Sequence, residues 1–141
     1  VTDDELQELE DLVVAMSDPA ASDTEAADAD RLFHLTIARI AGNPVIEHCI
    51  QLIWRMRNEL PKVKQVYSRV CHHDWEARTD EHAAVLAALK ARDAAASRSA
   101  MRDHFHRLFE AMLEATEKDA LAEVRRRTEH DRERFLATTR I

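Results

Sequence analysis

Four polar residues of this sequence fall on apolar helical stripes, where a lone polar side chain is costly to bury. Asp30 and His34 lie four positions apart in the stretch DADRLFH. Residues at this spacing share one helix face, so both side chains can reach the same point. They are in register with Ile37 and Ala41, which predicts that both point into the core.

Two further histidines, His82 and His104, each lie among apolar residues at helical spacing. Those residues are Val85, Leu86 and Leu89 on the first stripe and Met101, Phe105 and Leu108 on the second. Three imidazole nitrogens and one carboxylate oxygen form a ligand set for a divalent metal, and the ion offsets the burial of a charged aspartate. We predict one site made by Asp30, His34, His82 and His104. Zinc and nickel suit it best, and manganese and iron stay open.

The alternative is that these are separate half-buried residues, satisfied by backbone or water. For a single histidine that is the commoner case, and four inward residues together make it less attractive. Of the other histidines, we expect three at the surface: His48, His106 and His130. His72 and His73 fall near a predicted helix end, where capping or exposure is expected and a substitute ligand stays open.

Arg57 is a candidate for ligand binding. It follows Ile53 by four residues and Ile50 by seven, which places a guanidinium on an apolar stripe. One interpretation is a salt bridge to an internal acid, or a side chain that reaches out to solvent. The other is that Arg57 pairs with a carboxylate of a small acid whose remaining oxygens fill open metal positions.

Composition predicts one all-α domain, a single antiparallel bundle of about five to seven helices. The 141 residues are 45% apolar and include only one glycine and three prolines. A net charge of −7 argues against binding to a phosphate backbone by these residues. Two cysteines, Cys49 and Cys71, are too few for a disulfide framework, and no leader or membrane span is recognisable. A reducing cytoplasm is expected.

Helical periodicity covers nearly the whole chain. The predicted helices span residues 3–16, 24 or 28 to 41, 44–70 with a bend at Pro61, 76–91 and 94–116, followed by a charged, partly exposed helical tail at 117–141. Gly42 is expected in a left-handed conformation, with Asn43 as N-cap and Pro44 as the first residue of the next helix.

Each of the first three helices carries an apolar stripe that we expect to be buried. The stripes are Leu6, Leu9, Val13 and Met16, then Phe33, Ile37 and Ile40, then Ile46, Ile50 and Ile53. Apolar residues on outer faces could supply part of a homodimer contact. These are Leu32, Leu35, Phe109 and Leu113.

Two stretches carry a family resemblance. They read DADRLFHLTIARIAGNPVIEH and DEHAAVLAALKARDAAASRSAMRDHF. Together they resemble the ligand-binding domain of the FadR subfamily of GntR-type transcriptional regulators, often called the FCD domain, over nearly all of residues 3–116. The resemblance places the metal ligands at Asp30, His34, His82 and His104.

The resemblance further implies a dimer that binds DNA through an N-terminal winged helix and responds to a small carboxylate. That winged helix is not in this chain, which resembles a domain that starts after its first helix, so residues 1–141 are expected to be the effector- and metal-binding domain alone. The stretch WRMRNELPKVKQVYSRV resembles the branch that responds to hexuronates and related sugar acids, while lactate-like and dicarboxylic acids stay open.

Two other functions fit a histidine-rich helical site. A metal with open positions could activate water for hydrolysis, but the expected general base is missing, since Glu81 adjoins His82 and should project to a different face. A purely structural metal would have a closed shell with no exchangeable ligand. We therefore expect a sensor domain rather than an enzyme.

Overall fold

The computed structural model describes the backbone of residues 1–73 and 75–139 and the side chains of residues 1–70 and 77–139. This part of the chain contains six helices and no strand, which confirms the all-α prediction. The helices are α1 (Asp3–Ser17), α2 (Asp23–Ile40), α3 (Pro44–Glu59), α4 (Pro61–His73), α5 (Trp75–Lys90) and α6 (Ala94–Thr139). Cys49 is free and exposed. The expectations for the side chains of Cys71, His72 and His73 lie outside the described residues.

Reciprocal capping boxes begin the first two helices. Thr2 and Glu5 cap α1, and Ser22 and Glu25 cap α2, each pair exchanging side-chain and backbone hydrogen bonds. Such a box satisfies two backbone donors that a helix start otherwise leaves unpaired. These local signals explain why α2 begins at Asp23, slightly before the predicted start at residue 24 or 28.

The turn between α2 and α3 follows the prediction. Gly42 adopts φ +66°, a left-handed conformation that glycine reaches without a Cβ penalty. The side chain of Asn43 then accepts hydrogen bonds from the backbone amides of Val45 and Ile46, at 3.0 and 3.3 Å. Pro44 is the first residue of α3.

The prediction of one bent helix over 44–70 is wrong, because the chain forms two separate helices there. Leu60, which precedes Pro61, is extended with φ −90° and ψ 109°. The proline ring crowds the preceding residue and disfavours its helical conformation. The break turns the chain so that α4 can cross the molecule.

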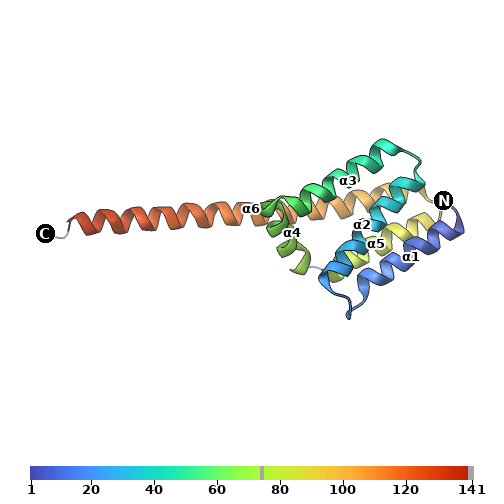
Figure 1. Cartoon of the computed structure of the whole chain (residues 1–141), viewed down its shortest axis with the longest axis horizontal. Helices are drawn as coiled ribbons and strands as arrows, with labels where there is room; N and C mark the ends of the chain where they lie inside the picture. The colour runs from blue at the N-terminus through green and yellow to red at the C-terminus, as the bar shows by residue number, and fades with distance from the viewer. Residues whose placement is uncertain (74, 140–141) are drawn as a thin grey trace.

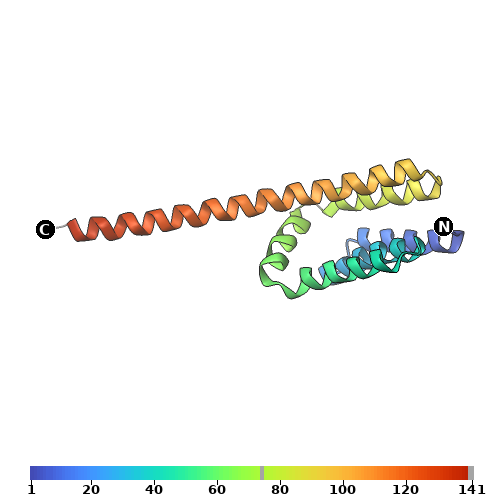
Figure 2. The same cartoon turned by 90° about the horizontal axis from the view of Figure 1, so that it is seen from above.

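Two layers of helices enclose the core (Figures 1 and 2). One layer holds α1, α2 and α3, and the other holds α5 and the first half of α6, with α4 connecting them at one end. The buried core cluster consists of Leu6, Leu9, Val13, Phe33, Val85 and Leu86. These residues belong to the stripes predicted for the first two helices and for the helix that carries His82.

The stripe predicted for α3 is wrong. Ile46 and Ile53 are 46% and 58% exposed, whereas Trp54 is 8% exposed. Within the described residues α3 packs only against α2 and α4, so it buries a narrow face. That face is set by the neighbours of α3, and it is not the most apolar face in the sequence.

The last helix continues far beyond the bundle. Residues 94–116 and the predicted tail form one uninterrupted helix, α6, whose second half projects alone in Figure 1. An ion pair of 2.5 Å joins Arg69 of α4 to Asp119 of α6. In the part of the chain that the structure describes, no helix combines the length and apolarity needed to cross a bilayer.

Candidate metal centre

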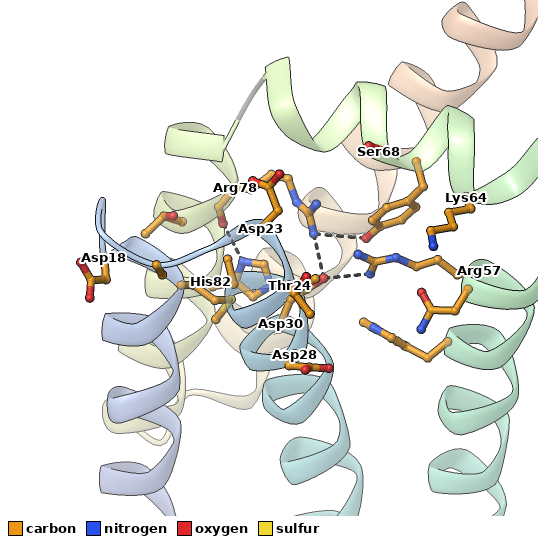
Figure 3. A pocket seen from close by; sticks show the side chains of 18 of the residues that line it. Asp18, Asp23, Thr24, Asp28, Asp30, Arg57, Lys64, Ser68, Arg78 and His82 are labelled. Atoms are coloured by element: carbon orange, nitrogen blue, oxygen red, sulfur yellow. Dashed lines mark hydrogen bonds and ion pairs between the residues drawn. The ribbon is translucent and has the colours of Figure 1, made fainter.

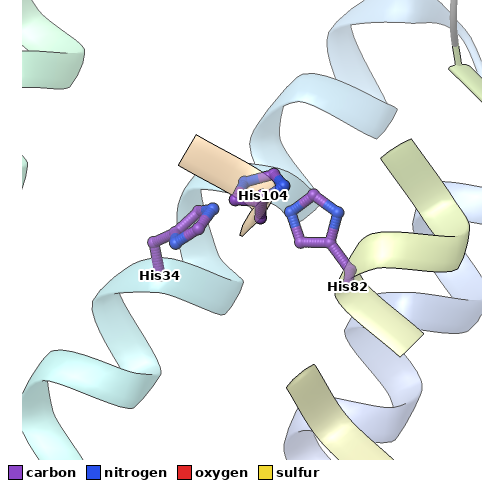
Figure 4. Close-up of side chains that lie close together, drawn as sticks. All are labelled: His34, His82 and His104. Carbon is purple, nitrogen blue, oxygen red and sulfur yellow. The ribbon is translucent and has the colours of Figure 1, made fainter. Parts of the chain in front are cut away.

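Three histidines from three helices meet between the two layers. His34 comes from α2, His82 from α5 and His104 from α6, and their exposed fractions are 3%, 2% and 2%. One ring nitrogen of each lies within 4.8 Å of the others, as Figure 4 shows for the converging rings. This spacing lets one ion bind three imidazoles after small side-chain adjustments.

Asp30 adjoins two of these histidines and is 4% exposed. Its Oδ1 atom lies 3.1 Å from Nε2 of His82 and 3.5 Å from Nε2 of His34. Its Oδ2 atom accepts hydrogen bonds of 3.1 Å from both Arg57 and Arg78. The carboxylate therefore turns one oxygen toward the histidines and the other toward two guanidinium groups (Figure 3).

The protonation states of the cluster suit a cation. Burial lowers the pKa of His104 to about 3 and also lowers the pKa of His34, so both rings are neutral at pH 7. Burial raises the pKa of Asp30, but its contacts with Nε2 of His34 and of His82 and the charge of Arg78 hold it well below its usual value. Neutral imidazoles and an ionised carboxylate are the forms that bind metals, so the states of His34, His104 and Asp30 suit a divalent ion.

Two of the rings are oriented by hydrogen bonds at Nδ1, the nitrogen that faces away from the cluster. Nδ1 of His82 lies 2.6 Å from the backbone oxygen of Arg78, one turn earlier on α5. Nδ1 of His104 lies 2.9 Å from Oε2 of Glu81. Both acceptors leave the Nε2 atoms for the centre of the cluster.

Glu81 is therefore a site residue that sequence reasoning missed. It was expected to project to a different face from His82, and its carboxylate contacts Nδ1 of His104 and, at 2.5 Å, Nε of Arg107. Burial raises the pKa of Glu81, and the guanidinium of Arg107 opposes that rise. The sequence did contain a signal, since Arg107 follows His104 by three residues and so lies on a neighbouring part of the same helix face.

A cavity of about 690 Å³ opens beside the cluster and reaches it at Asp30 and His82 (Figure 3). Cationic and aromatic side chains line one side. The guanidinium carbon of Arg57 lies 3.5 Å from the ring centroid of Tyr67, and Arg78 donates a 3.2 Å hydrogen bond to the hydroxyl of Tyr67. The cavity thus brings two guanidinium groups to the edge of the candidate metal site.

Arg57 lies at this cavity, but on a different face of α3 from the one predicted. Its side chain is 12% exposed and forms an ion pair with Asp30, as one of the two sequence interpretations proposed. It shares the buried face of α3 with Trp54, three residues earlier, rather than with Ile50 and Ile53. The other lining residues of note, Arg78 and Tyr67, were missed.

Trp54 also lines the cavity, and its indole nitrogen is buried without a hydrogen-bond partner among the described residues. An unpaired buried donor costs free energy, so a donor of this kind at a cavity is a position where a ligand acceptor would be favourable.

The remaining histidine predictions hold for the described side chains, since His48, His106 and His130 are all exposed.

Residues 1–107 match the family model of the FCD domain. The chain belongs to the FCD domain family. The match includes all five candidate residues of this FCD domain and ends inside α6, so the projecting half of that helix lies beyond it.

Two curated relatives are regulators by name. The FCD domain is 28% identical over 93 residues to the Uxu operon regulator of Haemophilus influenzae, covering 63% of this chain and 34% of that protein. It is 28% identical over 116 residues to the Uxu operon transcriptional regulator of Escherichia coli, covering 79% of this chain and 42% of that protein. The chain thus spans less than half the length of these relatives. No solved structure matches it.

Proposed function

We propose that this FCD domain senses a small organic acid at a divalent metal site and thereby controls a transcriptional regulator. The observation that carries the proposal is the meeting of three buried imidazoles and an ionised aspartate at the wall of a cavity that also holds two guanidinium groups. A cation beside guanidinium groups suits an anion that can bind both.

The cavity favours an acid with several oxygens. One carboxylate can pair with Arg57, a second oxygen can enter the coordination shell, and a further acceptor can take the free indole N–H of Trp54. Hexuronates and aldonates carry a carboxylate and many hydroxyls, whereas a fatty acyl chain offers few acceptors. We therefore favour a sugar acid.

The named relatives support the regulatory part of the proposal. Both are called operon regulators and are more than twice as long as the aligned region. We infer that DNA binding resides in a domain separate from these acidic residues, and that the regulator works as a homodimer in the cytoplasm. The exposed apolar residues Leu32, Phe109 and Leu113 are available for a dimer contact.

Hydrolysis is less well supported than sensing. Glu81 is close enough to the site to be considered as a base, but it contacts Nδ1 of His104, on the far side of the ring from the predicted ion. The second oxygen of Asp30 is bound by two guanidinium groups. Among the described residues, neither carboxylate is placed to take a proton from a metal-bound water.

The experiment is calorimetric titration of the zinc- or nickel-loaded domain with hexuronates, aldonates, lactate, dicarboxylates and a fatty acid. We expect binding of a sugar acid that requires the metal and is weakened at least tenfold in Arg57→Ala, the usual scale for a charge-assisted bidentate contact. Arg55→Ala is the matched control, because Arg55 is exposed on the same helix.

Three results would contradict the proposal. A native preparation without metal whose melting temperature is unchanged by zinc or nickel would remove the metal site. Metal binding without any exchangeable ligand would favour the structural role. Turnover of a bound acid would favour an enzyme.

A further inference from the structure

His104 is held from behind by a carboxylate that is itself held by a guanidinium. Its Nδ1 atom lies 2.9 Å from Oε2 of Glu81, and Nε of Arg107 lies 2.5 Å from Oε1 of the same carboxylate. A carboxylate paired with a guanidinium accepts hydrogen bonds, so the ring donates through Nδ1–H. The lone pair of the neutral ring then resides on Nε2.

We propose that Glu81, anchored by Arg107, is a positioning residue that fixes the tautomer and orientation of His104 for metal binding. This inference rests on the proposed metal site. Glu81 does not touch the ion in this arrangement, and its effect reaches the metal only through the imidazole. Carboxylate–histidine–metal chains of this kind typically contribute 10- to 100-fold to metal affinity.

The contrast with His82 explains why a second residue is needed. His82 finds its acceptor in its own helix, at the backbone oxygen of Arg78 one turn earlier. His104 has its acceptor on the neighbouring helix α5 instead. Glu81 and His82 are successive residues, so one turn of α5 orients two of the three imidazoles.

The role of Arg107 is to hold the carboxylate in place. The side chain of Glu81 is 20% exposed and that of Arg107 is 39% exposed, so the pair lies at the edge of the buried cluster. Without Arg107 the carboxylate can rotate toward solvent, but it can still accept a hydrogen bond from Nδ1–H of His104. Removal of the Arg107 side chain should therefore weaken metal binding less than removal of the Glu81 side chain.

The test compares zinc affinities, measured by competition with a chromophoric chelator. We expect Glu81→Ala to bind zinc about 10- to 100-fold more weakly than the wild-type domain. Glu81→Gln should lose less, because its amide oxygen still accepts from Nδ1–H, and Arg107→Met should also lose less. The controls are Asp80→Ala and Arg102→Met, exposed positions on the same two helices, and both should bind like the wild-type domain.

Nitrogen NMR of the imidazoles gives a readout that a general loss of stability would not produce. In the metal-free domain at neutral pH, His104 should be protonated on Nδ1, and Glu81→Ala should populate the Nε2–H tautomer. If Glu81→Ala fails to fold, the tautomer of His104 in the wild-type domain and the smaller losses of zinc affinity in Glu81→Gln and Arg107→Met carry the test.

Two results would overturn the inference. One is Glu81→Ala zinc affinity within about twofold of wild type, far below the expected effect of such a partner. The other is a wild-type His104 that carries its proton on Nε2. A wild-type domain that binds no zinc would instead refute the proposed metal site, and the NMR measurement would still decide the orientation of His104.

Discussion

Helix α6 has two halves with the same secondary structure and opposite surroundings. The first half packs against α4 and α5 and buries His104 to 2% exposure, whereas the half beyond Asp119 projects with Leu121, Val124 and Phe135 at 52%, 62% and 67% exposure. Helical propensity therefore does not distinguish them. The difference lies in which residues find partners, and the site chemistry belongs entirely to the packed half.

The largest expected effect tests whether ligand chemistry is confined to the packed half. We expect His104→Ala to lower zinc affinity by at least two orders of magnitude, because one of four ligands and an oriented imidazole are lost. His106→Ala, two residues away with a side chain 72% exposed, should leave the affinity unchanged. Direct metal titration with elemental analysis would measure both. Equal losses in the two variants would contradict the assignment.

Acid should destabilise the metal-free domain through the packed half. The pKa of His104 is lowered to about 3 in the folded state, so between about pH 6.5 and 3 the unfolded chain binds a proton that the folded chain does not. Stability therefore falls as pH drops through this window, by up to about 1.4 kcal/mol per pH unit for each such histidine. His34 acts in the same direction, and the lowered pKa of Asp30 extends the loss to lower pH.

Urea unfolding between pH 7 and pH 4.5 measures this slope. His104→Gln should flatten it, because glutamine does not titrate. An unchanged slope in that variant would show that the pH dependence arises elsewhere.

The smallest expected effect lies where the two halves of α6 meet. Asp119→Ala removes the ion pair with Arg69. The side chain of Arg69 is 47% exposed and that of Asp119 is 49% exposed. Exposed pairs of this kind contribute little to stability, because water and salt screen the attraction. Denaturant unfolding at low and high salt would measure the change, and zinc affinity should stay at its wild-type value. A loss of zinc affinity would show that the projecting half influences the site.

The sequence was informative where a polar residue interrupts an apolar stripe. Asp30, His34, His82 and His104 were singled out because burial of a polar side chain needs a partner, and all four are buried within one cluster. The family resemblance pointed to the same residues. Whether they bind an ion stays a prediction.

The sequence was less informative where packing rather than composition decides. Ile46 and Ile53 form the more apolar face of α3, yet that face is exposed because α3 has neighbours on one side only. Glu81 and Arg78 were missed for a related reason. Their importance comes from partners on other helices, and single-helix periodicity carries no information about which helices are adjacent.

The length of α6 gives the molecule a mechanical property. Thr139 lies roughly 50 Å beyond His104 on the same helix, at about 1.5 Å of rise per residue. If the helix moves as a rigid rod, a tilt of one degree at His104 displaces its tip by roughly 0.9 Å. The projecting half is then a lever arm, and changes too small to notice at the imidazole cluster become displacements of atomic size at its far end.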